Sequence, residues 1–227
     1  DQWPDAVERH GRDRRESGNG MNGGAAMITA ARGHVYDLLV IVFRRPLDAG
    51  QLQRLRTPEM LAAMAAAGID PGDDFINGDS EVLLDQLAID YTQLFNDPVE
   101  RIAPYECIQR GDGDDLMGAA ANEVRDFMAE VGFSVPPEGG EMPDHISVEL
   151  AFMGELIRRE ADALGAGDQK TADFAASVQR RFMAAHLGQW AERFARKVWR
   201  RATTPFYAAM AELLGGFIAE ERNAKAA

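Results

Sequence analysis

Residues 141–153 read EMPDHISVELAFM, a stretch that begins among helix breakers and ends as one face of an apolar helix. Pro143 suits the first helical position, because its missing N–H would have no partner there in any case. The pattern predicts a helix over residues 143–164 with Asp144 and His145 in its first turn. Its apolar residues recur at helical spacing: Ile146, Leu150, Met153, Leu156 and Ile157.

The Asp144-His145 pair has a structural and a functional interpretation. The charge of Asp144 would meet the positive end of the helix dipole, which is sufficient to explain an aspartate. A histidine there should stay neutral, so that it can both donate and accept a hydrogen bond. Glu149 lies one turn further on and is placed to orient the imidazole. These residues alone leave both interpretations open.

The same periodicity predicts helices on both sides of this one. We expect them over residues 26–43, 57–68, 81–95, 115–131 and 168–201, with a last helix from Thr204-Pro205 to about residue 218. Thr57, Pro58 and Glu59 form an N-cap, a first-turn proline and a first-turn acid. No segment alternates convincingly with period two. The fold class is therefore all-α, a single-domain irregular bundle of about seven helices.

The domain organisation follows from these boundaries. Residues 26–222 form the helical domain, residues 223–227 a short tail, and residues 1–25 a flexible tail or added leader. The longest apolar run, residues 38–43, is too short to span a bilayer. A single cysteine, Cys107, permits no intrachain disulfide and fits a reducing compartment. A cytoplasmic protein without stable membrane insertion is expected.

The charge is concentrated in the middle of the chain. The net charge is −13, and residues 46–167 hold 25 acidic and 7 basic residues, a net of −18. Such an acidic segment argues against nucleic acid and anionic membrane as partners, and it would attract a basic ligand. Solubility, or adaptation to salt, would explain the same numbers.

The chain shows no recognisable catalytic chemistry. It has no P-loop spacing, no paired cysteines or histidine-rich metal spacing, and no Glu-x-x-His pair of the kind used by helical carboxylate metal enzymes. Cys107 has no base that the sequence identifies. We therefore predict a binding protein with no catalytic residues, no metal site and no cofactor of its own.

Four stretches in order resemble one family. They are DYTQLFND with APYEC (residues 90–107), PDHISVELAFM (143–153), RRFMAAHLGQW (180–190) and PFYAAMAELLGGF (205–217). Together they resemble the TorD/DmsD/NarJ family, cytoplasmic chaperones of molybdenum-cofactor oxidoreductases, over roughly residues 27–220. Departures are Cys107, where many members have serine, and the absence of the usual glycine after the Leu-Phe helix.

The resemblance implies a peptide-binding site for the twin-arginine signal peptide of a molybdopterin oxidoreductase subunit. Asp144 and Glu106 would accept hydrogen bonds from the two arginines. Aromatic and aliphatic side chains would line a groove for the apolar stretch. Of Leu94 and Phe95 we expect one to be ordinary core, as we do His186 and Trp190. The site residues that the resemblance implies are Tyr91, Leu94, Phe95, Pro104, Tyr105, Glu106, Asp144 and His145.

The sequence also leaves open an alternative function and a possible homodimer. The alternative function is a helical metal- or small-molecule-binding domain, or an enzyme, centred on Asp144, His145 and Glu149. The loops at 96–115 and 134–142 are candidate hinges for helix exchange, which would give a homodimer.

If the chain is such a chaperone, Asp144→Asn should weaken leader binding by ~1–3 kcal/mol, typical of a hydrogen bond to a charged group, while helix content barely changes.

Overall fold

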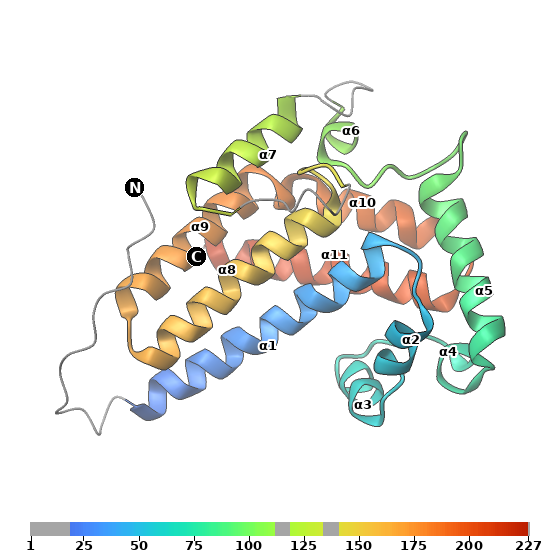
Figure 1. Ribbon diagram of the computed structural model, residues 1–227, viewed down its shortest axis with the longest axis horizontal. Helices are drawn as coiled ribbons and strands as arrows, with labels where there is room; N and C mark the ends of the chain where they lie inside the picture. The colour runs from blue at the N-terminus through green and yellow to red at the C-terminus, as the bar shows by residue number, and fades with distance from the viewer. Residues whose placement is uncertain (1–18, 112–118, 134–140, 227) are drawn as a thin grey trace.

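The computed structural model describes residues 19–111, 119–133 and 141–226, and all regular structure in these ranges is helical (Figure 1). The all-α prediction is confirmed. The helices are α1 (Asn19–Arg44), α2 (Ala49–Leu55), α3 (Pro58–Ala66), α4 (Asp73–Asn77), α5 (Ser80–Tyr91), the π-helix η1 (Thr92–Asn96), α6 (Glu106–Arg110), α7 (Ala119–Glu130), α8 (Ile146–Ala166), α9 (Gln169–Ala185), α10 (Leu187–Arg201) and α11 (Pro205–Ala226).

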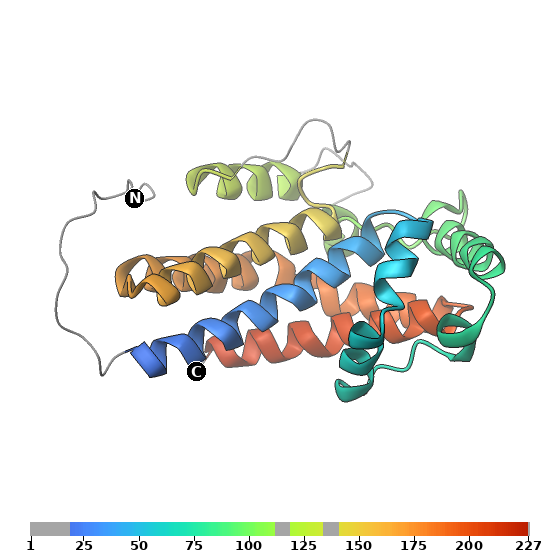
Figure 2. The same ribbon diagram turned by 60° about the horizontal axis from the view of Figure 1, so that its bottom comes forward.

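The long helices form a bundle, and the short ones gather at one end of it. α1 packs along α8, α8 along α9, and α10 along α11. Figure 2 shows α7 as an outer layer over this bundle, with α2 to α5 at the opposite end from the start of α1. The C-terminal end of α1 and the start of α8 therefore meet beside the segment that contains the predicted site.

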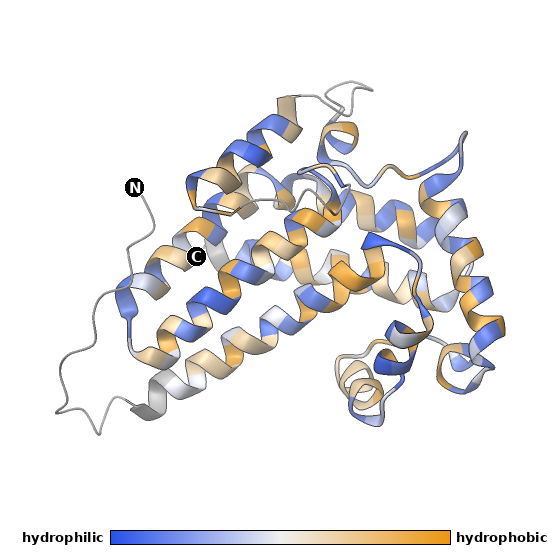
Figure 3. Ribbon diagram, viewed as in Figure 1, coloured by the Kyte–Doolittle hydropathy of each residue, from blue (hydrophilic) through white to orange (hydrophobic). Residues whose placement is uncertain are grey.

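Aromatic side chains fill the core beneath that junction. Phe43 of α1 meets Phe194 of α10 edge to face at 5.8 Å, and Phe95 of η1 stacks on the same ring at 6.0 Å. Tyr91 touches Phe95 edge to face at 4.7 Å. In Figure 3 the strongest hydrophobic colour of α1 lies at its C-terminal end, in agreement with this cluster. The cluster therefore brings together three segments that are distant in sequence: the end of α1, the α5–η1 junction and α10.

α1 is long and apolar enough to cross a membrane by length and composition alone. Within Gly23–Arg44, an 18-residue window has a mean hydropathy of 1.4. Core helices pass the same test, and in this fold Tyr36, Leu39 and Val42 of α1 are completely buried. Packing in the bundle accounts for these three residues, whereas Met27 and Ile28 near the start of α1 are exposed.

The predicted helix count of about seven is too low, because eleven α-helices occur in the described ranges. Three of the additional helices, α2, α4 and α6, have seven residues or fewer, so they show no apolar period. α2 depends instead on a capping box in which Asp48 and Gln51 bond to each other's backbone N–H groups. The fourth arises because the helix predicted over residues 168–201 is broken.

The break falls at His186, between α9 and α10. The His186 N–H still bonds to the Phe182 carbonyl oxygen, but its backbone then leaves the helical region, with φ −127° and ψ −95°. A Cβ on Gly188 would lie 2.5 Å from the carbonyl oxygen of Met183. Only glycine lets the chain pass this close, and the apolar spacing carries no sign of it.

Other boundaries agree with expectation. α3 begins where predicted, with the Thr57 hydroxyl accepting from the Met60 N–H and Pro58 at the first position. α1 starts at Asn19 and α11 ends at Ala226; the proposed domain limits remain predictions. The start of the predicted helix 115–131 and most of the loop 134–142 lie outside the described residues.

Candidate functional site

A cleft of about 940 Å³ opens where the end of α1, η1, the loop after η1 and the start of α8 meet. Five of the eight predicted site residues line it: Tyr91, Phe95, Pro104, Tyr105 and His145. The remaining lining residues are Arg44, Arg45, Pro46, Asn96, Pro98, Val99, Arg101, Ala103, Ile108 and Glu141. Five of the residues that the resemblance implied therefore surround one hollow, and their role in binding remains a prediction.

The π-helix η1 decides which residue of the Leu-Phe pair reaches this cleft. Leu94 is buried outside the cleft lining, whereas Phe95 contributes to its wall. One of the two is thus core, as expected. The Leu94 carbonyl oxygen accepts the Ile102 N–H at 2.7 Å, which fastens the loop after η1 back onto it. π-Helical turns are often found at functional sites.

A single antiparallel bridge joins Tyr105 to His145. The Glu106 N–H donates to the Asp144 carbonyl oxygen at 2.9 Å, and the Ile146 N–H donates to the Pro104 carbonyl oxygen at 2.9 Å. The two rings meet edge to face with centroids 5.1 Å apart. Two motifs about forty positions apart in the chain thereby form one wall of the cleft.

His145 is the N-cap of α8, which begins at Ile146 and not at Pro143 as predicted. Its Nδ1 atom accepts the Ser147 N–H at 3.2 Å and lies 2.8 Å from the Ser147 hydroxyl oxygen. Burial, opposed by Glu141 and reinforced by Arg44, lowers the pKa of His145 to about 4. The imidazole is therefore neutral at pH 7, as predicted, and with Nδ1 accepting it carries its proton on Nε2.

Asp144 lies before α8 and caps α6 instead. Its Oδ2 atom accepts the Cys107 N–H at 3.1 Å, while its carbonyl oxygen takes the Glu106 N–H. These are two of the donors that the first turn of a helix leaves without partners. The side chain is completely buried, and burial raises the pKa of Asp144. Burial and the neighbouring Asp144 raise the pKa of the Cys107 thiol to about 12.

Glu106 is likewise completely buried and already has partners. One carboxylate oxygen lies 2.8 Å from Arg110 Nη1, and the other lies 3.1 Å from His186 Nδ1. The side chain thus connects α6 with the start of α10. Because neither Glu106 nor Asp144 faces the cleft, the predicted role of both as acceptors for arginine is not available in this conformation.

Glu149 is a third completely buried acid behind the cleft. The Trp190 indole N–H donates to its carboxyl group at 3.2 Å, so Glu149 does not orient His145. Burial and the charge of Glu106 raise the pKa of Glu149 well above its ordinary value. Glu106, Asp144 and Glu149 therefore hold α6, α8 and α10 together from the inside.

Asp144, His145 and Glu149, the residues of the alternative metal or small-molecule site, do not point to a shared position where a ligand could bind. The three side chains bond to Cys107, Ser147 and Trp190 respectively. Within residues 19–111, 119–133 and 141–226, no group of three or more His, Cys, Asp or Glu side chains is arranged to hold a metal ion. This geometry does not favour the alternative function.

The cleft lining is basic. This differs from the acidic site expected from the net charge of −18 over residues 46–167. Arg44, Arg45 and Arg101 contribute three positive charges, and Glu141 is the one acid among the lining residues. Glu141 pairs with Arg44 at 3.2 Å. The net charge of a segment includes acids on every face of the fold and buried ones such as Glu106 and Asp144. It therefore does not indicate which acids face the cleft.

Sequence reasoning missed four charged residues of the site. Arg44 and Arg45 follow the helix predicted over residues 26–43, and no pattern there indicates a binding site; the same holds for Arg101. Glu141 opens the stretch that predicts the α8 helix, yet it was not considered as a site residue. Its position two residues before Pro143, in the same motif as His145, is the signal that could have found it.

Comparison with known proteins adds an independent finding. The sequence profile "Nitrate reductase delta subunit" matches residues 57–196. Chaperone protein TorD of Shewanella loihica is 32% identical over 199 residues, which cover 81% of this chain and 87% of that protein. The protein of the same name from Vibrio parahaemolyticus is 27% identical over 197 residues, 82% of this chain and 90% of that one. The TorD of Shewanella oneidensis is 26% identical over 214 residues, at 86% and 91% coverage.

Proposed function

This chain belongs to the TorD/NarJ family of redox-enzyme maturation proteins, and on that premise we propose that it is the private chaperone of one molybdopterin oxidoreductase. It binds the twin-arginine leader of the catalytic subunit in the cytoplasm and delays its export. It holds the apoenzyme open until the molybdopterin cofactor is inserted. The cofactor belongs to the client, and the chaperone catalyses no reaction.

The shape and lining of the cleft are the main support for this proposal. Tyr91, Phe95, Tyr105 and His145 give it aromatic walls, and its 940 Å³ is at the upper end of the size of ligand pockets. An apolar helix laid into such a groove is a common mode of peptide recognition. We therefore assign the cleft to the apolar stretch that follows the two arginines of a leader.

Glu141 is assigned to the arginine pair. Glu141 is the one acidic residue in the cleft lining. It forms an ion pair with Arg44, whose side chain is half exposed. A leader arginine that binds both carboxylate oxygens would displace Arg44 at little cost, because exposed ion pairs are weak. Lysine offers one point charge in place of a planar fork, so a Lys-Lys leader should bind less well.

The direct test is titration of the full chain with a twin-arginine leader peptide of a molybdopterin oxidoreductase and with its Lys-Lys version. Tyr105→Ala should weaken binding by about tenfold or more, the usual cost of an interface anchor. Glu141→Gln should remove the preference for Arg-Arg over Lys-Lys. Ile89→Ala, which changes an exposed apolar residue of α5 outside the cleft, is the control. Leader binding that none of these cleft changes affects would overturn the assignment.

A further inference from the structure

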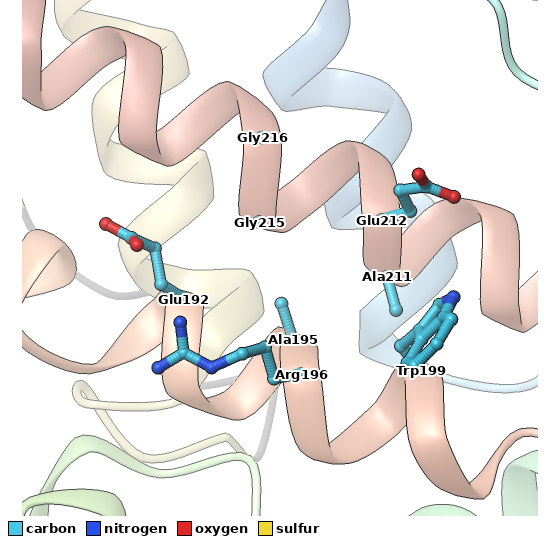
Figure 4. Close-up of a pocket in the computed structure, with 8 residues that line it drawn as sticks. All are labelled: Glu192, Ala195, Arg196, Trp199, Ala211, Glu212, Gly215 and Gly216. Carbon is cyan, nitrogen blue, oxygen red and sulfur yellow. The ribbon is translucent and has the colours of Figure 1, made fainter.

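A second hollow surface runs along the outer face of α11 and shares no residue with the cleft. Two hollows of about 250 Å³ and 570 Å³ have Trp199, Glu212 and Gly216 in common, and we call them together the α11 groove. Figure 4 shows the smaller one between α10 and α11. We propose that the α11 groove binds a helix of a partner protein that has one apolar face and arginine or lysine along its edges.

The floor of the groove is apolar. Trp199 is 54% exposed, a large fraction for a side chain of this size. On α11, Ala209, Leu213 and Phe217 are only partly buried and follow one another at helical spacing. Tryptophan is enriched among the anchor residues of protein interfaces. A continuous stripe of this kind matches the apolar face of a second helix.

Two adjacent glycines lie in the middle of this floor, inside the helix α11. Glycine in a helix interior destabilises it relative to alanine, so a compensating reason is expected. A Cβ on Gly216 would meet no atom within 4 Å, and one on Gly215 would meet only Ala195 Cβ, at 3.4 Å. The packing of this chain therefore does not require glycine at Gly216. A bare backbone facing outward lets another helix approach closely.

Acidic side chains flank the apolar floor. Asp70, Glu212 and Glu220 line the larger hollow, are exposed, and make no ion pair within the described part of the chain. Glu192 of the smaller hollow pairs with Arg222 at 3.0 Å, and Arg196 is the cation of the lining. The negative charge along the edges is thus largely uncompensated. Charge complementarity favours a partner with arginine or lysine at its edges.

The groove is already formed in the chain alone. The loop between α3 and α4 supplies one wall, and Gly72 there has φ +90°, with its Cβ position 2.7 Å from Pro205 Cβ. Phe75 and Phe206 stack beside this contact at 4.7 Å, nearly parallel. Glycine at Gly72 is therefore needed for the loop to press against the start of α11. A fixed wall limits the ordering cost of binding.

A second copy of the chain is a less suitable occupant. Its cationic helix is α10, which carries five arginine or lysine residues between Arg193 and Arg201. The apolar face of α10, formed by Trp190, Phe194 and Val198, is completely buried in its own core. A copy could present that face only by unfolding, whereas a partner helix from another protein has no such cost.

The test uses synthetic helical peptides of about five turns with one leucine-alanine face and edges of arginine, glutamine or glutamate. Each is titrated into the full chain by calorimetry, with the fluorescence of Trp199 as a local reporter and Trp199→Phe to identify its signal. The arginine peptide should bind, with affinity that falls as salt increases. Equal binding of the arginine and glutamate peptides would overturn the proposal.

Two matched pairs of variants locate the binding. Gly216→Leu fills the floor and should weaken arginine-peptide binding by about tenfold or more, while Gly165→Leu in α8, whose Cβ position is equally open, should not. Glu212→Gln with Glu220→Gln should lower affinity and its salt dependence, whereas Glu81→Gln with Asp85→Asn on α5 should not. Thermal unfolding checks that all variants fold. Binding insensitive to Gly216→Leu and to the paired groove change, or self-association that Gly216→Leu abolishes, would contradict the proposal.

Discussion

His145 combines a structural and a binding role at the scale of one side chain. The Nδ1 atom that caps α8 can accept a hydrogen bond only while the imidazole is neutral. The same ring lines the cleft beside Tyr105. The Asp144-His145 pair was hard to interpret from the sequence because the histidine caps α8, whereas the aspartate before it caps α6.

We expect His145 to make folding stability fall with acid. The folded-state pKa of about 4 lies below the ordinary 6.5, so the unfolded chain binds a proton that the folded chain does not. The stabilisation is present above about pH 6.5 and is lost as pH falls towards 4, by roughly 3 kcal/mol in total. His145→Asn keeps a capping side chain and removes the titration, so urea unfolding between pH 7 and 4.5 should show a flatter profile.

The exposed His34 supplies the control. His34→Asn replaces an exposed histidine that caps no helix, and the profile of this variant should follow that of wild type. If His145→Asn and wild type lose stability in parallel between pH 6.5 and 4, the neutral capping role assigned to His145 is wrong.

Glu149 should act with the opposite sign. Burial and Glu106 raise its folded-state pKa, so the folded chain holds a proton that the unfolded chain releases, and stability falls as pH rises above about 4.5. Glu149→Gln keeps an acceptor for the Trp190 indole and cannot ionise. We expect it to match wild type near pH 4 and to be more stable at pH 8, on the order of 1–4 kcal/mol. Denaturant unfolding at both pH values measures this, with the exposed Glu123→Gln as control; equal stability at pH 8 would refute it.

At the scale of elements, the site depends on the short helix α6. A five-residue helix is not stable by itself. α6 is held by the buried Asp144, which accepts at its first turn, and by Glu106, which bonds to His186 at the start of α10. Its position then sets that of Tyr105 in the cleft wall. α6 itself gave no periodic signal in the sequence.

This placement changes the expectation for Asp144. Asn at this position can still accept the Cys107 N–H, so Asp144→Asn should now leave leader binding within about twofold of wild type, which is less than 0.5 kcal/mol. Asp144→Ala should cost about 1 kcal/mol, as for a lost helix cap. Hydrogen exchange at the Cys107 amide should be faster in the alanine variant alone. Loss of leader binding in Asp144→Asn with normal exchange would instead show that the carboxylate reaches the peptide.

At the scale of the whole molecule, periodicity located the long helices, apart from the break at His186, and did not locate the site. Apolar spacing predicted the helical class, whereas Tyr91, Phe95, Tyr105 and His145 were implied only by the family resemblance. Burial could not be inferred for Glu106 and Asp144, since their partners Cys107 and His186 are brought to them only by tertiary folding. The polarity of the cleft was mispredicted because Arg44 and Arg45, at the end of α1, lie outside the acidic segment of residues 46–167.

The fold also separates charge of opposite sign. The cleft carries Arg44, Arg45 and Arg101, while the α11 groove carries Asp70, Glu212 and Glu220. Their lining residues do not overlap, so each surface can be altered without touching the other. The proposed leader site and the proposed site for a cationic helix can therefore be tested separately.

Hydrogen exchange across the full chain, with and without a twin-arginine leader peptide, tests whether the leader occupies the cleft. We expect slower exchange in η1, in α6 and in the first turn of α8, where Phe95, Tyr105 and His145 line the cleft, and unchanged exchange along Pro205–Ala226. Slower exchange confined to α11, or none anywhere at saturating peptide, would contradict this expectation.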